Sequence, residues 1–540
     1  MKLYKYSLPF VAALFAVGCE DIENQVPSGN GITEAQNTEA VIKDPSLADA
    51  SFLGMFDMMG YPGYALGDRA DDFGYIMMAF SNDIEGADVV LPNSNYNWFS
   101  VCGEYSSRTA SYANPRIRYA TPYNQIYIAN DIIRTTAAAT DSANVCKRAQ
   151  AYAVRAFAYE QLAPSFQFLR NLDEPCVPIV TEKTTDFFNN PRATVREIYD
   201  LILADLDSAI AYLPGYNRPS NAFVNLQVAY GLRARANLAL GKYEAAADDA
   251  TKAIGDLLPA SIEEVSRPSF YNISDKNWIW GIDMTAALAA KYAYATSDSW
   301  IRSFSGDSYS AGTACYAMIN TLLYDKIPAT DVRKGWWVDE NLESPALENE
   351  EWSNDGKVTK GQAIATLEIE DVKEAFLPYT NVKFGMASGI GSTTNDSDWP
   401  LMRVEEMILI QAEGYAKSGN EAKAKEILGN FVKTYRDPSY DVNAYGNLAD
   451  EIWKQRRIEL WGEGFFVFDA NRLQKPIVRF HDDSNNMPDA FRFNLDANDG
   501  WRLMRFPQSE LNTNAAIVDN SDGAKPQVNS GSSLRDGVTD

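Results

Sequence analysis

The chain has 540 residues and a formal net charge of −25, and 46% of its residues are hydrophobic. This charge argues against a nucleic-acid partner, because phosphates require a basic surface. The hydrophobic content and the 11 Trp, 29 Tyr and 25 Phe are sufficient for a large folded core.

The first eighteen residues have the order of a removable secretion signal. Lys2 and Lys5 provide a short positive start, and a mostly apolar run follows at residues 8–17. This run is far shorter than the roughly 20 residues that a helix needs to cross a bilayer. We therefore predict that residues 1–18 are a signal peptide that is cleaved rather than a membrane anchor.

Cys19 follows this signal and is followed at once by Glu20 and Asp21. The segment LFAVGC resembles the lipobox of bacterial lipoproteins, with Ala16 where a leucine is usual. This resemblance implies that Cys19 carries acyl chains such as palmitate, because several chains hold a protein to a membrane far better than one. The acidic residues after Cys19 resemble the tag that exports lipoproteins to the cell surface in the Bacteroidetes. The alternative is an ordinary secreted protein whose cleavage site falls near a cysteine.

The remaining chain divides into a tether and one domain. Residues 19–45 are polar and predict a lipidated tether. We assign residues 46–540 to a single domain, with loop-rich insertions around residues 60–112 and 260–400. A further irregular stretch covers residues 475–540.

Residues 225–254 contain the clearest helical pair. Apolar and small residues recur at helical spacing on both sides of Gly241, which resembles a tetratricopeptide repeat with its glycine turn. Residues 403–436 contain a second copy, in which Gly419 takes the place of Gly241. The two glycines are 178 residues apart, which is no multiple of the usual period of about 34. A large insertion must therefore separate the two copies.

Other amphipathic stretches complete the predicted scaffold. They are residues 116–136, 149–163, 194–214 and 448–472. Together these segments predict an all-α fold of about eight helices, or four tetratricopeptide-like pairs, with a large loop-rich insertion. Such stacks need at least three repeats to bury their faces.

Five segments in chain order carry a family resemblance. They are YNQIYIANDII, AYAVRAFAYEQLAPSF followed by VPIV, RVEEMILIQAEGYAKSGN, IWKQRRIELWGEGFFVFDANR and RFPQSELNTN. These segments resemble motifs of the SusD/RagB family of outer-membrane nutrient-binding lipoproteins of the Bacteroidetes. Gln455 and Phe466 depart from the family pattern at positions that we expect to be structural.

The resemblance implies a SusD-like fold and a role in nutrient uptake. We expect a surface lipoprotein that binds a nutrient, most simply an oligosaccharide, and delivers it to a SusC-type TonB-dependent outer-membrane transporter. We expect binding without turnover. The alternatives are a surface glycoside hydrolase that uses a carboxylate pair, and a non-catalytic structural subunit of the transporter.

The sequence offers little catalytic chemistry. His481 is the single histidine, so a multi-histidine zinc site is excluded, and no Gly-x-Ser-x-Gly, P-loop or Rossmann glycine motif occurs. We therefore predict no cofactor and no metal, although residues 496–500 partly resemble a calcium loop. Glycoside hydrolysis needs only two carboxylates, and the adjacent acid pairs are Asp71–Asp72, Asp248–Asp249 and Glu405–Glu406.

Aromatic and polar residues in the irregular segments are the candidate ligand contacts. A flat ring can cover the C–H face of a sugar, and loops can present such rings because core packing does not require them. The candidates are Asp83, Tyr96, Trp98, Tyr294, Trp300, Trp336 and Trp337. Trp98 could equally belong to the core, and one of two adjacent tryptophans often faces inward. Trp453 and Trp461 share one helix face and are expected in the core.

Four cysteines remain besides Cys19. They are Cys102, Cys146, Cys176 and Cys315. Three pairings are possible for four cysteines, and the sequence does not choose among them. Free buried thiols in a large core fit the sequence as well as a disulfide does.

Overall fold

The structure is a computed structural model, and it describes most of the chain. The described residues are 34–44, 46–67, 69–92, 98–292, 294–305, 317–348, 350–354, 357–360, 377–481 and 485–531. The predicted signal peptide, the lipidation site Cys19, the candidate ligand residue Tyr96 and Cys315 lie outside these residues.

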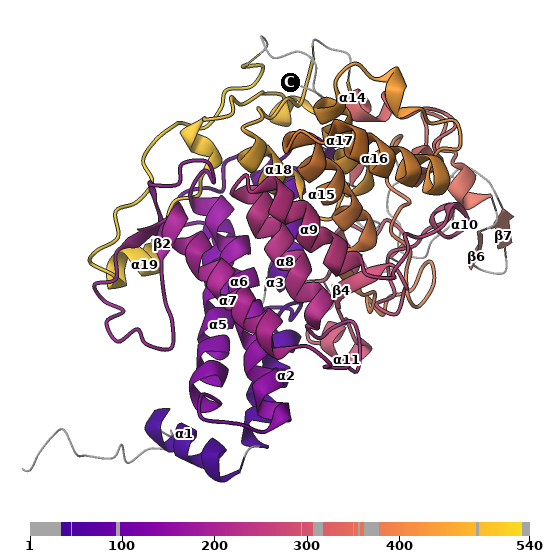
Figure 1. Ribbon diagram of the computed structural model, residues 1–540. Coiled ribbons are helices and arrows are strands. Elements are labelled where there is room, and N and C mark those ends of the chain that lie inside the picture. Colours follow the sequence, from indigo (N-terminus) through magenta and orange to yellow (C-terminus); the bar gives the residue numbers. More distant parts are fainter. Residues whose placement is uncertain are drawn as a thin grey trace, which may run out of the picture.

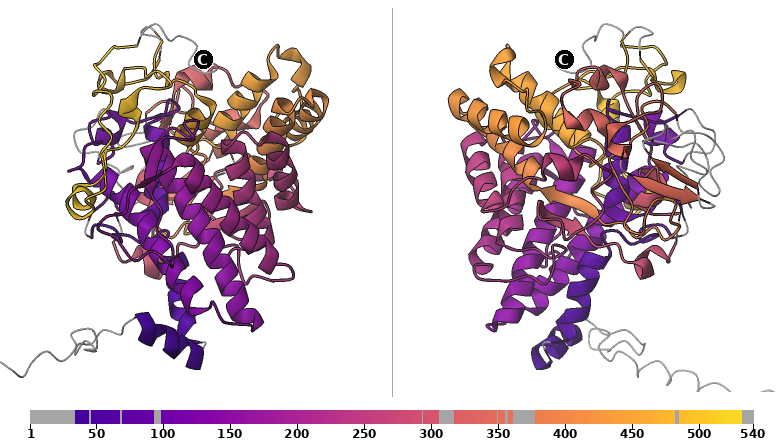
Figure 2. Two further views of the ribbon diagram at one scale, coloured as in Figure 1. Left: turned by 60° about the vertical axis from the view of Figure 1, so that its left-hand side comes forward. Right: turned by 90° about the vertical axis from the view of Figure 1, so that its right-hand side faces the viewer.

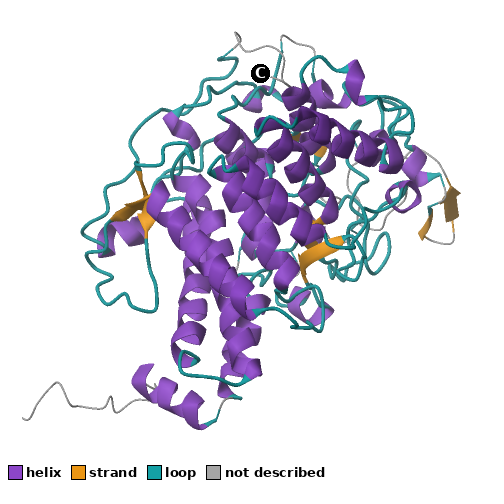
Figure 3. Ribbon diagram, in the orientation of Figure 1, coloured by secondary structure: helices purple, strands orange, loops and turns teal. Residues whose placement is uncertain are grey.

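Eight helices pack side by side and form the helical scaffold (Figures 1 and 3). They are α5 (Ala113–Thr135), α6 (Ser142–Phe166), α7 (Val195–Tyr212), α8 (Leu226–Ala239), α9 (Tyr243–Ile254), α15 (Val404–Lys417), α16 (Glu421–Tyr435) and α17 (Leu448–Glu459). The predicted all-α fold with tetratricopeptide-like pairs is therefore confirmed.

Small residues explain how the pairs pack so closely. Gly241 and Gly419 end their helices with φ of 73° and 90°, which a glycine adopts without steric cost. Ala234 and Ala412 are fully buried where the helices meet. A Cβ added to Gly414 would lie 2.6 Å from the Tyr243 carbonyl oxygen, so α15 can approach α9 only with glycine there.

The large insertion leaves the scaffold after α9 and returns just before α15. Helices α9 and α15 pack directly against each other although a long segment separates them in the sequence. The return passes through β8 (Trp399–Arg403), which pairs antiparallel with β4 (Trp278–Ile282). Figure 2 shows the scaffold helices on one side of the molecule and the loop-rich insertion on the other.

The remaining elements are shorter. The other α-helices are α1 (Glu34–Lys43), α2 (Leu47–Asp57), α3 (Gly74–Ile84), α4 (Ser100–Gly103), α10 (Ile262–Val265), α11 (Ala286–Ala289), α12 (Ser297–Trp300), α14 (Thr321–Tyr324), α18 (Phe466–Leu473) and α19 (Gln508–Thr513). The 3-10 helices are η2 (Val332–Trp336), η3 (Pro345–Leu347), η5 (Val442–Ala444), η6 (Asp489–Phe491) and η7 (Gly500–Arg502).

Strands contribute little to the fold. In the described parts of the chain they form two-stranded antiparallel sheets. Besides β4 with β8, the pairs are β1 (Val89–Val90) with β5 (Met318–Ile319), β2 (Pro175–Pro178) with β3 (Arg192–Thr194), and β6 (Glu351–Asn354) with β7 (Lys357–Lys360).

Three elements differ from the sequence predictions. Residues 34–43, expected in the tether, form α1, and the irregular stretch at 60–112 contains the eleven-residue helix α3. The single helix predicted at 448–472 is instead two helices, α17 and α18. Gly462 and Gly464 separate them because both have positive φ, of 80° and 92°, which breaks helical geometry.

A buried network of ion pairs joins the insertion to the scaffold. Glu459 accepts hydrogen bonds from Arg436 at 2.8 and 2.9 Å, and Glu463 accepts two from Arg403 at 2.8 Å. Lys383 of the insertion donates to Glu463 at 2.7 Å. The network, called here the Glu459 cluster, contains four cations and four carboxylates, each at most 2% exposed at the side chain: Arg333, Lys383, Arg403, Arg436, Asp331, Glu405, Glu459 and Glu463.

In the Glu459 cluster, burial and ion pairing have opposite effects on the pKa of each group. Burial lowers the pKa of the Lys383 ammonium to about 8, although Glu463 partly opposes that change. The arginines outweigh burial at Glu459, so its pKa lies well below the ordinary value. The pKa of Glu463 is lowered by Arg403 and Lys383 in the same way, so Glu459 and Glu463 are ionised at neutral pH and act as structural partners of these cations.

No helix in the described residues is both long enough and apolar enough to span a bilayer.

We expect Gly464→Ala to lower the free energy of unfolding more than Gly419→Ala. The two glycines have similar φ, 92° and 90°, so each alanine costs about 1–2 kcal/mol in backbone strain. The methyl group added at Gly464 would also lie 2.5 Å from Ala79 Cα, whereas nothing lies within 4 Å of the one at Gly419. Urea unfolding of both variants measures the difference, and equal losses would contradict a tight contact between Gly464 and α3.

Candidate ligand-binding surface

The loop of residues 61–72 precedes α3 and closes on itself. The Gly63 amide donates to the Asp72 carbonyl oxygen at 2.6 Å, and the Leu66 amide donates to Asp72 Oδ2 at 2.6 Å. Gly63 and Gly67 both have positive φ, as the two tight turns require. Burial raises the pKa of Asp72 to about 6. These bonds hold the loop in one compact shape.

Trp98 contacts this loop through a cation–π interaction with Arg69. The Arg69 guanidinium carbon lies 4.9 Å from the centre of the Trp98 ring. Asp71 holds the same guanidinium with two hydrogen bonds, at 2.8 and 2.9 Å. Trp98 is half-buried, so its ring is fixed in place and still partly open to solvent.

A third segment, residues 292–300, meets the other two. The buried Trp300 indole N–H donates to the Ala70 carbonyl oxygen at 2.9 Å. Phe99 packs edge-on against the Trp300 ring at 4.8 Å between ring centres. Trp300 therefore joins the loop of residues 61–72, the segment at Trp98 and Phe99, and its own segment.

Two pairs of tyrosines belong to these converging segments. Tyr61 and Tyr64 form an edge-on pair with ring centres 6.0 Å apart, and Tyr292 and Tyr294 form another at 6.3 Å. Tyr294 is 43% exposed and the other three are half-buried. We define the aromatic surface as Tyr61, Tyr64, Arg69, Trp98, Tyr292 and Tyr294.

Four of the sequence candidates lie in the interior, which corrects the prediction that they face a ligand. Trp300, Trp336 and Trp337 are each 1% exposed, so their ring faces are covered by protein. The Trp336 indole N–H donates to the Val265 carbonyl oxygen, and the Trp337 ring packs edge-on against Trp461. Their fixed position in the core leaves no ring face for a sugar.

Asp83 is also structural. It is 3% exposed, and its carboxylate accepts hydrogen bonds from the backbone amides of Gly464 and Phe466 at 2.8 and 3.1 Å. Burial raises its pKa to about 7. Asp83 therefore positions the glycine turn between α17 and α18 rather than a ligand.

Trp98 and Tyr294 are the described candidates that the structure brings to an accessible surface. The sequence reasoning missed Tyr61, Tyr64 and Arg69. The stretch GYPGYALGDR carries a signal for them, because its two tyrosines lie between glycines that allow tight turns.

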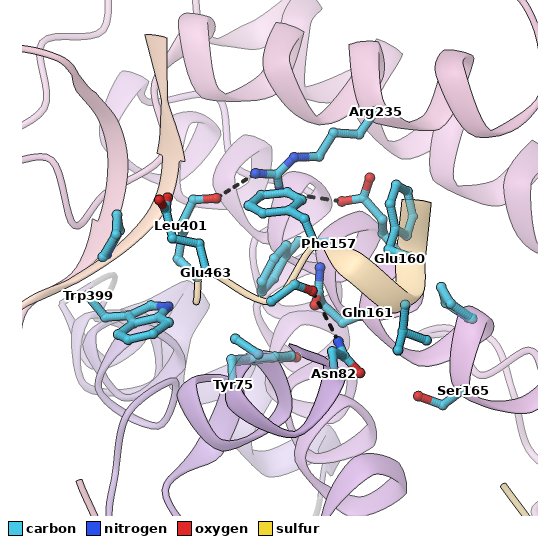
Figure 4. A pocket seen from close by; sticks show the side chains of 17 residues that line it. Tyr75, Asn82, Phe157, Glu160, Gln161, Ser165, Arg235, Trp399, Leu401 and Glu463 are labelled. Carbon is cyan, nitrogen blue, oxygen red and sulfur yellow. Dashed lines mark hydrogen bonds and ion pairs between the residues drawn. The ribbon is translucent and has the colours of Figure 1, made fainter. Parts of the chain in front are cut away.

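A small internal cavity lies between α3, α6, α8, β8 and the residues around α18 (Figure 4). Arg235 pairs with Glu406 through two hydrogen bonds of 2.7 Å, and its other terminal nitrogen lies 3.9 Å from Glu160. Both carboxyl oxygens of Glu160 are buried without a hydrogen-bond partner in the described structure. The cavity volume of about 50 Å³ fits a few water molecules, since one needs roughly 10–15 Å³. It is too small for a sugar ring.

The carboxylate pairs noted in the sequence are largely engaged by arginines. Asp71 is held by Arg69, Asp249 by Arg233, and Glu406 by Arg235. Glu405 belongs to the Glu459 cluster. Within the described ranges no group of three or more His, Cys, Asp or Glu residues could hold a metal ion. The three described cysteines, Cys102, Cys146 and Cys176, are free thiols.

Two family models match the chain. The one described as "Starch-binding associating with outer membrane", SusD-like, matches residues 70–238, and the one described as "SusD family", SusD/RagB, matches residues 340–523. No curated protein sequence matches the chain significantly.

Several solved structures share the fold. A SusD-like carbohydrate binding protein from Bacteroides vulgatus is similar over 87% of this chain and 96% of its own, with 24% identity and a TM-score of 0.69. A SusD superfamily protein from Bacteroides thetaiotaomicron covers 88% and 99%, with 19% identity and a TM-score of 0.67. Surface glycan-binding protein A from the same species, in complex with laminarihexaose, covers 88% and 98%, with 17% identity and a TM-score of 0.61.

We expect Glu160→Gln to gain stability relative to the wild type as pH rises. Burial raises the pKa of Glu160 from 4.5 to about 8, so the stability that its proton contributes is lost as pH rises across that window. The amide cannot ionise, and the gain is at most about 1.4 kcal/mol per pH unit. Glu406→Gln is the control. It removes the carboxylate that pairs with Arg235, so it should lower the free energy of unfolding by about 3–5 kcal/mol. Urea unfolding between pH 5 and 9 measures both, and a pH-independent difference for Glu160→Gln would contradict the shift.

Proposed function

The chain belongs to the SusD/RagB family, and from that premise we propose that it binds an oligosaccharide at the cell surface without cleaving it. In this proposal a lipid on Cys19 anchors the protein to the outer membrane. The bound glycan then passes to a SusC-type TonB-dependent transporter.

The observation that carries the proposal is the fixed indole of Trp98 on the aromatic surface. The ring is held by Arg69 and stays partly open to solvent. Tyr294, which is 43% exposed, belongs to the segment that Trp300 connects to the loop that holds Arg69. Rings held in place before binding lose little conformational freedom on contact with a ligand. Such a surface suits the C–H faces of sugar rings, and the nearby Arg69–Asp71 pair can take hydroxyl groups.

The relatives support the same ligand class. One structurally similar protein was solved with laminarihexaose, and another is described as a carbohydrate binding protein. One of the matching family models is described as starch-binding and associated with the outer membrane.

The N-terminal arrangement suits a lipid-anchored protein. Helix α1, the first described element, lies at one extreme end of the molecule in Figure 1. The residues between Cys19 and α1 precede the folded body in the sequence. A lipid on Cys19 would therefore join the folded body from the end at which α1 lies.

The engaged carboxylates favour binding over hydrolysis. A glycosidase needs one carboxyl group as acid and a second as base or nucleophile, both facing the scissile bond. Glu405 and Glu406 are fully buried in arginine pairs, and Asp249 is held by Arg233. A structural subunit without its own ligand remains as the other alternative, and it predicts no glycan affinity for the isolated protein.

We expect Trp98→Ala to lower glycan affinity at least about tenfold. Burial of an aromatic side chain contributes roughly 1.5–3 kcal/mol, and 1.4 kcal/mol is about a tenfold change in affinity. Calorimetry of residues 20–540 against a panel of neutral, acidic and amino glycans measures the loss. Tyr212→Ala is the matched control, because Tyr212 is also an exposed ring beside an arginine, Arg148, but lies on α7.

Product analysis of the same mixtures separates the alternatives. An intact glycan after incubation fits the proposal, whereas cleaved products would support the hydrolase. Absence of binding across the whole panel would overturn the proposal and favour the structural subunit. Equal losses in the Trp98 and Tyr212 variants would place the ligand elsewhere.

We expect Cys19→Ala to abolish incorporation of labelled palmitate and to release the protein from the outer-membrane fraction. The reason is that Cys19 supplies the only thiol at the end of the signal segment. Cys146→Ala, which removes another thiol that is not fully buried, should retain both label and anchor. Labelling of the Cys19 variant at the wild-type level would contradict the anchor site.

A further inference from the structure

A groove beside the aromatic surface has no assigned role. It lies between α2, the segment at Phe223, the end of β4 and α11, and its volume is about 320 Å³. This volume lies at the lower end of the range for small-molecule sites, roughly 300–1,000 Å³. Its lining residues include Phe56, Asp57, Tyr61, Phe223, Asp283 and Lys291.

The walls of the groove are apolar and preformed. Phe56 and Phe223 pack edge-on with ring centres 5.0 Å apart, and Phe52 stacks on Phe223 at 5.9 Å. Gly281, also in the lining, cannot gain a side chain without meeting Trp278 and the Trp399 carbonyl oxygen. These contacts hold the groove open in one shape, which favours binding because little has to be ordered.

Two carboxylates lie in the lining of this groove. Among the described residues, neither the Asp57 nor the Asp283 side chain has a hydrogen-bond or ion-pair partner. Burial, followed by the charge of Asp283, raises the pKa of Asp57. Asp398, whose carboxylate accepts from the Ile273 and Met284 amides, also senses the charge of Asp283. Lys291 brings one positive charge to the lining, and in the described structure it forms no ion pair with either aspartate.

The groove is continuous with the aromatic surface. Tyr61 lines the groove and also pairs with Tyr64 on the loop that holds Arg69. At the other side, Leu288 and Lys291 line the groove, and the chain continues directly to Tyr292 and Tyr294. An oligosaccharide on the aromatic surface can therefore extend into the groove.

We propose that the groove is a subsite for a sugar residue that carries a protonated amine, such as an unacetylated hexosamine. This inference rests on the proposed function and names the ligand class of the same surface. The C–H face of the residue lies against Tyr61 and the apolar wall, and the ammonium group lies between Asp57 and Asp283. A cation there offsets the repulsion of the two carboxylates, whereas an acidic sugar would add to it.

Calorimetry with three hexasaccharides at pH 6.5 tests this inference. The probes are a glucosamine hexamer, its N-acetylated counterpart and laminarihexaose. The expected result is that the glucosamine hexamer binds the wild type at least tenfold more tightly than its N-acetylated counterpart. The preference should weaken with added salt, because salt screens charge attraction.

The double variant Asp57→Asn/Asp283→Asn should lose this preference and keep its affinity for the neutral probes. Asp200→Asn/Asp256→Asn is the matched control, since it removes two exposed carboxylates elsewhere and should keep the preference. Equal binding of amine and N-acetyl probes by the wild type, or a preference that survives in the Asp57 and Asp283 variant, overturns the subsite.

Failure of the subsite and failure of the proposed function give different results. If the amine preference is absent while Trp98→Ala still lowers glycan affinity at least about tenfold, only the subsite is wrong. If no hexasaccharide binds and Trp98→Ala changes nothing across the wider panel, the proposed function is wrong and the subsite falls with it.

Discussion

The buried Glu459 cluster is the interaction on which the rest of this structure depends. Glu459 and Glu463 lie at the end of the helical scaffold, whereas Arg333 and Lys383 come from the insertion. Four cations and four carboxylates balance within the cluster, so burial leaves no net charge without a partner. Removing one member of such a cluster costs about 3–5 kcal/mol, because the others stay buried. The cluster thereby ties a long irregular segment to a regular stack of helices.

This attachment decides which aromatic rings remain for a ligand. Trp337 packs against Trp461, and the Lys383 ammonium lies 4.7 Å from the Trp336 ring, so both tryptophans help to seal the cluster from water. Trp300 is also buried, and its contacts with Ala70 and Phe99 connect three segments of the chain. The rings that stay accessible and form the proposed ligand surface are therefore Trp98 and the tyrosines of the aromatic surface.

The acidic residues can be divided into those that are paired with arginines and those that line the groove. Most acids of the noted adjacent pairs are held by arginines, as in Glu406 with Arg235 and Asp249 with Arg233. A carboxylate held in this way serves poorly as a proton donor or nucleophile. The carboxylates of Asp57 and Asp283, in contrast, line an open groove and have no bonded partner within the part of the chain that the structure describes.

The helical pairs could be predicted because their cause is local. Gly241, Gly419 and the alanines around them show in the sequence where two helices can turn and pack closely, and the structure agrees. The break at Gly462 and Gly464 was missed because glycines inside an amphipathic pattern need not end a helix. A side chain at either position would meet atoms from distant parts of the chain, Phe384 at Gly462 and Ala79 at Gly464, so the need for glycine there arises from the tertiary structure.

The candidate site was only partly predictable, because loops carry no periodicity that separates buried rings from exposed ones. Trp98 and Trp300 look alike in the sequence, yet one is half-buried and the other is fully covered. Asp83 looked like a loop residue, but it lies on α3 and binds the backbone of residues 464 and 466. The sequence by itself determined the helical pairs and their family resemblance, since these depend on local spacing and order. Only the tertiary structure decided which rings face solvent, because that depends on which distant segment covers each one.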